Sequence, residues 1–228
     1  YPKGTARAGT ESGWFPWTDD YLLQVAVNPV VYMAYPTPIL SDLDFDIDGA
    51  MVIGFTDRFA SQWGWTNYAP DPAMTSTTTY EGNAGGDILR AFKSNGVFAL
   101  ENAGQSGSLS GGGLNNNEGP GFGEFFNDNF VGHNEVVAGG LAIKPGSGEV
   151  FIGAMDPGTI YCAGGVKVFN SINGFYSRAV NTYGNNCVIK NTATFGKSNG
   201  LGDIELALDV PNYSQIGDRV WQDDDADG

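Results

Sequence analysis

The sequence predicts an all-β protein, with a propeller-like domain or a sandwich of hairpins, and three observations support this. Glycine accounts for 34 of 228 residues and aromatic residues for 13%, a composition that favours strands joined by tight turns. No stretch of a dozen residues keeps a 3.6-residue period free of glycine or proline, which argues against helices. Four segments place apolar, strand-forming residues on both sides of a turn signal, which is typical of β-hairpins.

The first predicted hairpin is "LDFDIDGAMVIGF", in which Asp48-Gly49 forms a two-residue turn. Leu43, Phe45 and Ile47 would then face the core, and the alternating aspartates would line the outer face.

The other three hairpins are expected in "DILRAFKSNGVFALE", "EVVAGGLAIKPGSGEVFIGAMD" and "GGVKVFNSINGFYSRAV". The four turns fall near residues 48, 95, 146 and 173. The first two gaps are close to the length of one four-stranded propeller blade, whereas the shorter third gap keeps a sandwich open.

The domain organisation follows from composition. We predict a propeller-like domain over 1–210, a linker over 211–215 and the start of a further module over 216–228. Two turn-rich stretches, 59–86 and 102–135, read as long loops, which we expect to contribute contacts between copies of the chain.

The charge and the cysteines limit the function. The formal net charge is −15, which argues against nucleic acid because phosphate binding needs clustered Lys and Arg. No apolar run is long enough to insert into a membrane. Cys162 and Cys187 fit no zinc motif, and we expect them to form a disulfide if the protein is secreted.

The tail carries the most specific string, "IGDRVWQDDDADG". It resembles the start of the B-type, prealbumin-like repeat of the serine–aspartate repeat adhesins of bacterial surfaces. This resemblance implies that Asp223, Asp225 and Asp227 are Ca²⁺ ligands and that the protein is extracellular, at the cell surface. Residues 1–210 more loosely resemble propeller-like regions that precede such modules in large bacterial secreted proteins.

The segment "DFDIDG" contains the same kind of aspartate pattern as the tail. Its aspartates alternate with Phe45 and Ile47, and a strand follows at once, so a hairpin turn is the favoured interpretation. A cation site at Asp44, Asp46 and Asp48 stays open as the alternative.

No motif of a known catalytic class occurs in the sequence. A glycosidase would need a pair of carboxylates, for which the candidates are Asp57, Asp87, Glu124 and Glu135. In "WGWTNY", the side chains of Trp63, Trp65 and Tyr68 would either stack on a sugar or form a small core of their own.

The function expected from these observations is structural or adhesive. We expect a non-catalytic component of a bacterial extracellular assembly, such as a layer, stalk or fibre, in which copies of the chain contact one another. The alternative is a carbohydrate-binding domain or a glycan-cleaving enzyme.

Overall fold

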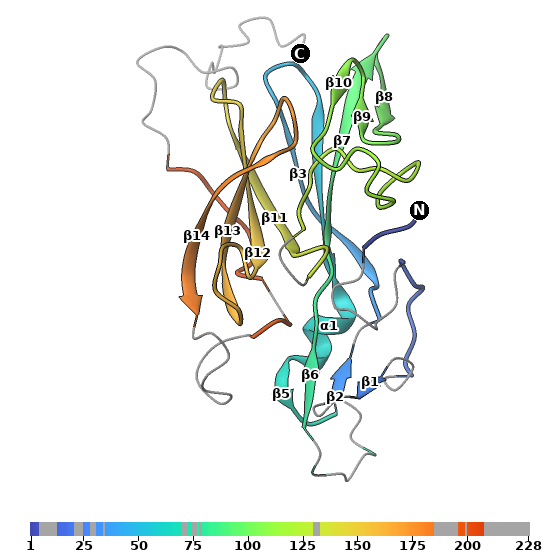
Figure 1. The fold of residues 1–228 in the computed structure, drawn as a ribbon, viewed down its shortest axis with the longest axis vertical. Coiled ribbons are helices and arrows are strands. Elements are labelled where there is room, and N and C mark those ends of the chain that lie inside the picture. The colour runs from blue at the N-terminus through green and yellow to red at the C-terminus, as the bar shows by residue number, and fades with distance from the viewer. Residues whose placement is uncertain are drawn as a thin grey trace, which may run out of the picture.

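The structure consists mostly of β-strands, which confirms the predicted all-β class (Figure 1). A computed structural model of the chain describes residues 1–4, 13–20, 25–27, 31–33, 35–69, 73, 77, 79–129, 133–184, 196–198 and 200–207. These residues contain one short helix, α1 (Arg58–Trp63). The strands are β1 (Val25–Val27), β2 (Val31–Met33), β3 (Pro38–Phe45), β4 (Met51–Asp57), β5 (Trp65–Asn67), β6 (Tyr80–Gly82), β7 (Asp87–Ser94), β8 (Val97–Leu100), β9 (Gln105–Ser106), β10 (Leu109–Ser110), β11 (Val137–Lys144), β12 (Glu149–Met155), β13 (Ala163–Asn170) and β14 (Tyr176–Gly184).

Two four-stranded antiparallel sheets make up most of the fold. Their strand orders are β3-β4-β7-β8 and β11-β12-β13-β14. The second sheet is a meander of consecutive strands, whereas in the first sheet β4 pairs with β7 although α1, β5 and β6 lie between them in the sequence. Both sheets run along the long axis in Figure 1, and β11 lies against β3 and β4. These two packed antiparallel sheets agree with the predicted all-β class, and each sheet has two open edges among the described strands.

All four predicted hairpins are present, as β3–β4, β7–β8, β11–β12 and β13–β14. Asn95 and Gly96 form the two-residue loop between β7 and β8, with φ angles of 51° and 81°. Positive φ at both positions is what a type I′ turn requires, and Asn-Gly is the pair that adopts it most readily.

The β3–β4 turn is one residue longer than predicted. The backbone N–H of Asp46 donates to the carbonyl oxygen of Ala50 at 2.9 Å, which leaves Ile47, Asp48 and Gly49 as a three-residue loop. Gly49 has a φ of 79°, as expected for the left-handed residue that closes such a loop.

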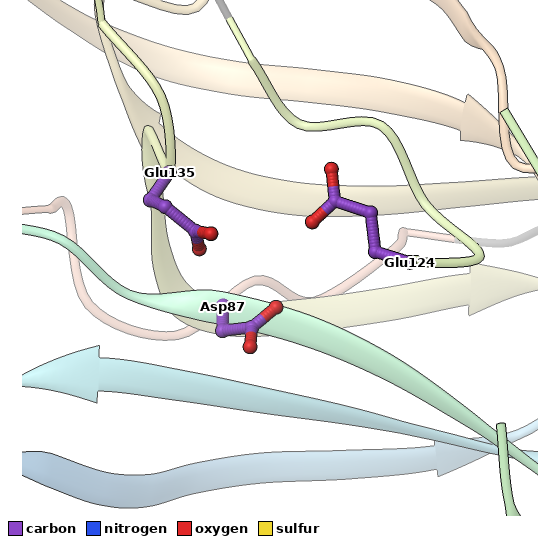
Figure 2. A group of neighbouring side chains, drawn as sticks. All are labelled: Asp87, Glu124 and Glu135. Atoms are coloured by element: carbon purple, nitrogen blue, oxygen red, sulfur yellow. The ribbon is translucent and has the colours of Figure 1, made fainter. Parts of the chain in front are cut away.

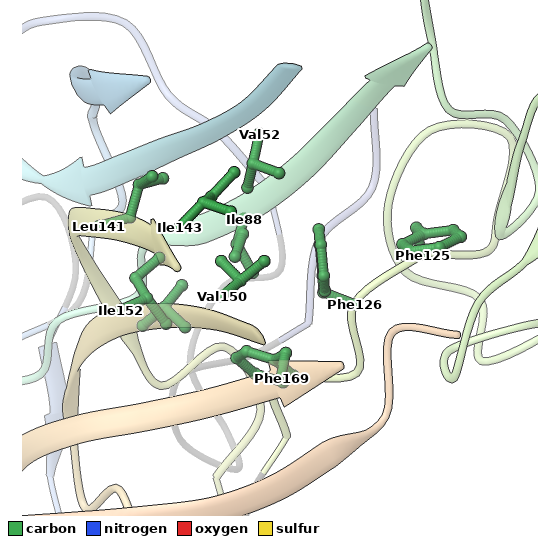
Figure 3. Close-up of a cluster of buried hydrophobic side chains, with 10 residues drawn as sticks. Val52, Ile88, Phe125, Phe126, Leu141, Ile143, Val150, Ile152 and Phe169 are labelled. Atoms are coloured by element: carbon green, nitrogen blue, oxygen red, sulfur yellow. The ribbon is translucent and has the colours of Figure 1, made fainter. Parts of the chain in front are cut away.

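The main hydrophobic core lies between the two large sheets (Figure 3). Phe125 and Phe126 complete this core although they belong to 102–135, the stretch expected to contact other copies. Both side chains are fully buried, and their rings pack edge to face with centroids 5.1 Å apart. This part of the stretch therefore packs on its own domain. The cluster consists of Val52, Ile88, Phe125, Phe126, Val137, Leu141, Ile143, Val150, Ile152 and Phe169.

Strand β3 faces the opposite way from the prediction. Leu43, Phe45 and Ile47, which were expected to face the core, are 44%, 53% and 79% exposed. Because side chains alternate between the two faces of a strand, the aspartates between them point toward the interior.

The physical reason is the open edge of β11. The carboxylate of Asp42 accepts a hydrogen bond from the backbone N–H of Leu141, and that of Asp44 accepts one from Ile143, both at 2.9 Å. These two N–H groups belong to a strand whose other edge pairs with β12, and unpaired edge donors need an acceptor. The two aspartates supply it.

The end of the hairpin is held by an arginine. The guanidinium of Arg90 in β7 lies 2.6 Å from a carboxylate oxygen of Asp48 and 3.8 Å from one of Asp46. Arg90 also donates to the carbonyl oxygen of Ser171, in the turn between β13 and β14. The aspartates of "DFDIDG" thus contact backbone amides and an arginine, and they do not line the outer face as the hairpin interpretation expected.

A smaller mixed sheet, β1-β2-β6-β5, lies next to α1 at the bottom of Figure 1. Helix α1 begins after Asp57, whose Oδ1 accepts hydrogen bonds from the N–H groups of Thr37 and Phe59, each at 3.0 Å. This is the usual chemistry of a helix N-cap. The helix anchors a second core of Tyr35, Phe59, Trp63 and Tyr80.

The predicted linker over 211–215 and the predicted module over 216–228 lie outside the described residues.

We expect Gly49→Val to destabilise the fold by roughly 1–2 kcal/mol, because a side chain disfavours the left-handed conformation. Gly13→Val is the matched control: a Cβ at either glycine meets open space, but only Gly49 has a positive φ. Urea unfolding measures both variants. An equal loss of stability in the two would contradict the conformational explanation.

We expect Asp44→Leu to destabilise the fold by about 1–3 kcal/mol, because the N–H of Ile143 loses its acceptor. Asp44→Asn keeps an oxygen at this position and should lose clearly less. The comparison is made by chemical unfolding at constant pH, and a Leu variant as stable as the Asn variant would show that this hydrogen bond is unimportant.

Candidate functional site

Three of the four acids named as catalytic candidates converge in the fold. One carboxylate oxygen of each of Asp87, Glu124 and Glu135 lies within 4.8 Å of the others. Figure 2 shows the three side chains around a common space. We call them the buried carboxylate cluster, because each is at most 1% exposed.

Separate parts of the chain position the three side chains. Asp87 opens β7, and Glu135 lies two residues before β11. Glu124 belongs to the stretch between the two sheets, where its backbone forms an antiparallel bridge with Gly113. The cluster therefore joins both sheets to the segment between them.

The N-terminal residues cover the cluster. The hydroxyl of Tyr1 donates to Asp87 Oδ2 at 2.5 Å, and the backbone N–H of Gly4 donates to Glu135 Oε1 at 2.5 Å. The ammonium group of Lys3 lies 3.5 Å from Glu135 Oε2, with neither side chain exposed. The hydroxyl and the amide thus supply hydrogen bonds to the cluster, and the lysine compensates part of its negative charge.

Asparagine side chains surround a fourth acid, Glu118. The carboxamides of Asn116, Asn129 and Asn134 all donate to its carboxylate. Asn116 also donates to Glu124 Oε1 at 2.7 Å. These neutral donors bind the carboxylates without changing the charge of the site.

A fifth acid, Asp128, lies beside the cluster and is fully buried. Its Oδ2 accepts the N–H of Val137 at 3.2 Å, while its Oδ1 has no hydrogen-bond partner. The ammonium group of Lys167 donates to the backbone carbonyls of Asp128 and Asn129 at 2.7 and 3.0 Å.

Burial and mutual repulsion make this region electrostatically unfavourable for carboxylates. Burial raises the pKa of Glu124 and of Glu135 well above the ordinary range, and the neighbouring acids raise both further. Burial also raises the pKa of Asp87, and it raises that of Asp128 to about 7. Such a group of carboxylates either retains protons or shares a cation.

The cluster does not have the form of a glycosidase site. A glycosidase exposes its two carboxylates in a cleft that admits a sugar ring, whereas these three are sealed from solvent. The fourth candidate, Asp57, lies apart as the N-cap of α1.

The aromatic residues of "WGWTNY" do not form an exposed platform. Trp63 is fully buried and packs on Phe59 and Tyr80, so its ring belongs to the small core and not to a glycan site. Trp65 is partly buried, and Tyr68 is exposed. Of the two interpretations, the structure therefore supports the small core for Trp63.

An aromatic cavity that the sequence did not indicate lies elsewhere, with a volume of about 410 Å³. Tyr176, the first residue of β14, and Phe175 just before it line the cavity together with polar side chains of other segments, so only the fold assembles it. The lining residues are Asn127, Asn129, Pro157, Gly158, Thr159, Lys167, Phe175 and Tyr176.

His133 also belongs to a buried group that the sequence did not predict. Its Nε2 lies 2.7 Å from the ammonium nitrogen of Lys197 and 3.6 Å from a carboxylate oxygen of Asp156. Lys197 in turn donates to Asp156. These three residues are far apart in the sequence, and no local motif announces their contact.

The remaining predicted sites are only partly within the described residues. Cys162 is disulfide-bonded, while Cys187, its predicted partner, lies outside the described residues, so the pairing stays a prediction. Asp223, Asp225 and Asp227 also lie outside them. In the described part of the chain, no helix is long and apolar enough to cross a membrane.

Two colossins of Dictyostelium discoideum are similar to this chain over most of its length. Colossin-A is 33% identical over 230 residues, covering 95% of this chain and 2% of Colossin-A. Colossin-B is 37% identical over 210 residues, covering 86% of this chain and 5% of Colossin-B.

Colossin-C, from the same organism, is 27% identical over 202 residues, which cover 85% of this chain and 19% of Colossin-C. The chain thus spans only a small part of these relatives. No family model and no solved structure matches it.

The resemblance to bacterial serine–aspartate repeat adhesins was wrong. The relatives found are proteins of a eukaryote, and the similarity to Colossin-A extends over 95% of the chain. The adhesin resemblance depended on the tail 216–228 alone. Alternating aspartates followed by glycine are what a cation-binding loop requires chemically, so such a short string is weak support for a family.

We expect the stability of the fold to fall as the pH rises from about 5 to 8 in the presence of a chelator. Burial raises the pKa of Asp57 to about 7 and that of Glu101 to about 8. In this pH range the folded chain therefore keeps protons that the unfolded chain has released. As the pH rises, each such group lowers the free energy of unfolding by at most about 1.4 kcal/mol per pH unit.

Asp57→Asn tests this directly, because it keeps an oxygen for the N-cap and does not titrate. It should reduce the fall between pH 5 and 8. The control is Glu149→Gln, since the hydrogen bond from Arg178 lowers the pKa of this partly exposed carboxyl, away from the range tested. Thermal unfolding across the pH range measures all three proteins, and an unchanged slope in Asp57→Asn would contradict the assignment.

Proposed function

We propose that this chain is a non-catalytic structural domain that associates with copies of itself in an extracellular or cell-surface assembly. The observation that carries this proposal is the apolar outer face of the sheet β3-β4-β7-β8. The disulfide at Cys162 supports the location, because disulfides persist mainly in oxidising compartments.

The outer face follows from the strand register. Residues directly opposite one another in antiparallel strands share a face. One row across all four strands consists of Phe45, Met51, Ala91 and Leu100, and a neighbouring row consists of Leu43, Ile53 and Leu89. The edge-strand residues of these rows are exposed, whereas Ala91 and Leu89 in β7 are buried.

Aromatic side chains lie across this face. The rings of Phe45 and Phe98 approach to 6.0 Å although they belong to the two edge strands. Phe45 and Leu100 are 53% and 43% exposed. Exposed apolar residues that gather on one sheet face are typical of an interaction surface.

Charge favours a second copy as the partner. The chain carries a net charge of −15, so two copies repel each other over most of their surfaces. These two rows contain no acidic side chain, because Asp42 and Asp44 point toward β11. The next row contains Asp87, opposite Phe55, but its side chain is buried in the carboxylate cluster. At the other end of this face, Lys93 in β7 lies opposite Phe98 in β8.

The sealing of the carboxylates supports a non-catalytic role. Asp87, Glu124 and Glu135 are inaccessible to a polymeric substrate in this structure. The alternative function, carbohydrate binding, has one specific observation in its favour, the cavity that Phe175 and Tyr176 line. Aromatic rings beside polar groups can stack on sugars.

We expect the purified chain to self-associate in a concentration-dependent way in analytical ultracentrifugation. The double variant Phe45→Ser/Leu100→Ser should weaken association at least tenfold, about 1.4 kcal/mol, while circular dichroism confirms its fold. Ile172→Ser is the matched control, because Ile172 is 60% exposed on the turn of the other sheet. A parent protein that stays monomeric, or that hydrolyses a glycan, would overturn the proposal.

A further inference from the structure

We propose that the buried carboxylate cluster, Asp87, Glu124 and Glu135, binds a calcium ion, with Asp128 beside it as a fourth acidic group. This site is separate from the aspartates of the tail, and it does not depend on the self-association proposed above. Four steps lead to it.

The first step is geometry. Ca²⁺ binds oxygen ligands at about 2.4 Å, so two ligands on opposite sides of one ion lie roughly 4.8 Å apart. One oxygen of each of Asp87, Glu124 and Glu135 lies within this separation of the others. A single ion therefore fits between the three carboxylates without a rearrangement of the backbone.

The second step is a buried oxygen that lacks a donor. Asp128 Oδ1 is buried without a hydrogen-bond partner, and the charge of Asp128 acts on both glutamates of the cluster. Glu135 Oε2 likewise accepts no hydrogen bond, and its nearest cation, Lys3, is 3.5 Å away. A buried acceptor without a donor destabilises the fold, and a bound cation would offset that cost.

The third step is the balance of charge. Five buried carboxylates gather here, whereas Lys3 and Lys167 are the lysines that act on them among the described residues. Buried charges need compensation by partners or by a metal, and a divalent ion reduces the negative excess. The carboxylates are those of Asp87, Glu118, Glu124, Asp128 and Glu135.

The fourth step is the choice of metal. The ligand atoms of the cluster are carboxylate oxygens, which suit calcium or magnesium better than zinc. Magnesium requires a near-ideal octahedron at about 2.0–2.1 Å and usually keeps several waters, whereas these carboxylates are buried, which favours calcium. The single histidine, His133, is in contact with Lys197 and Asp156.

The site would have a structural consequence. Asp87 belongs to the first large sheet, Glu135 precedes the second, and Glu124 lies in the segment between them. A bound ion would tie these three parts together and stiffen the stretch that contributes Phe125 and Phe126 to the core.

The test uses the 228-residue chain with Asp223→Asn/Asp225→Asn/Asp227→Asn as the background, which removes the other candidate for calcium binding. Titration calorimetry with CaCl₂ should detect one site in this background. Adding Glu124→Gln/Glu135→Gln should weaken binding at least tenfold. Adding Glu149→Gln, which changes a partly exposed glutamate of the second sheet, should leave the affinity unchanged.

Thermal unfolding separates loss of binding from loss of folding. Calcium should raise the Tm of the background protein but not that of the Glu124→Gln/Glu135→Gln protein. In a chelator, the latter should have an equal or higher Tm, because two buried charges are removed while the amide oxygens keep the contacts with Gly4 and Asn116.

Two outcomes would overturn the proposal. One is a background protein that shows neither heat of binding nor a shift in Tm at millimolar calcium. The other is a folded Glu124→Gln/Glu135→Gln protein that binds calcium with the affinity of the background. Magnesium chloride serves as the comparison ion and should bind more weakly.

Discussion

The arrangement of the two large sheets depends on how the open edge of β11 is satisfied. Leu141 and Ile143 present backbone N–H groups that no strand pairs with, and the carboxylates of Asp42 and Asp44 accept them. Close packing accompanies these hydrogen bonds, because a Cβ on Gly54 would overlap the carbonyl oxygen of Gly139. Strand β11 can therefore lie directly against β3 and β4, with the main core between the sheets.

This one constraint also determines the outer surface. Since side chains alternate along β3, inward aspartates force Leu43 and Phe45 outward. The apolar face on which the proposed self-association depends is thus the counterpart of the hydrogen bonds inside. The alternating sequence of β3 predicted apolar residues toward the core and aspartates toward solvent, and the structure has the reverse orientation.

Acidic side chains have two different environments in this fold. Asp46 and Asp48 contact Arg90 at the end of the first hairpin, where opposite charges compensate each other. In the buried carboxylate cluster, acids outnumber the nearby lysines, and neutral donors such as Asn116 supply hydrogen bonds without compensating charge. This difference is why we propose the cation site at the cluster and not at the "DFDIDG" hairpin.

The sequence by itself determined the all-β class and the four hairpins, because turn residues and strand propensity act over a few neighbouring positions. Asn95-Gly96, for example, adopts the positive φ angles that its type I′ turn needs. Asp87, Glu124 and Glu135 were among four candidate acids in the sequence, but their convergence could not be predicted, since it joins segments up to 48 positions apart.

Only the tertiary structure decided which face of β3 is buried and that Trp63 belongs to a small core. The length of the β3–β4 turn could not be predicted from the sequence either, because a loop of two or three residues fits the same Asp-Gly signal. In each case the deciding partner, such as Ile143 for Asp44, is distant in the sequence. Local patterns determine how a strand alternates, whereas the partner across the interface determines which side faces inward.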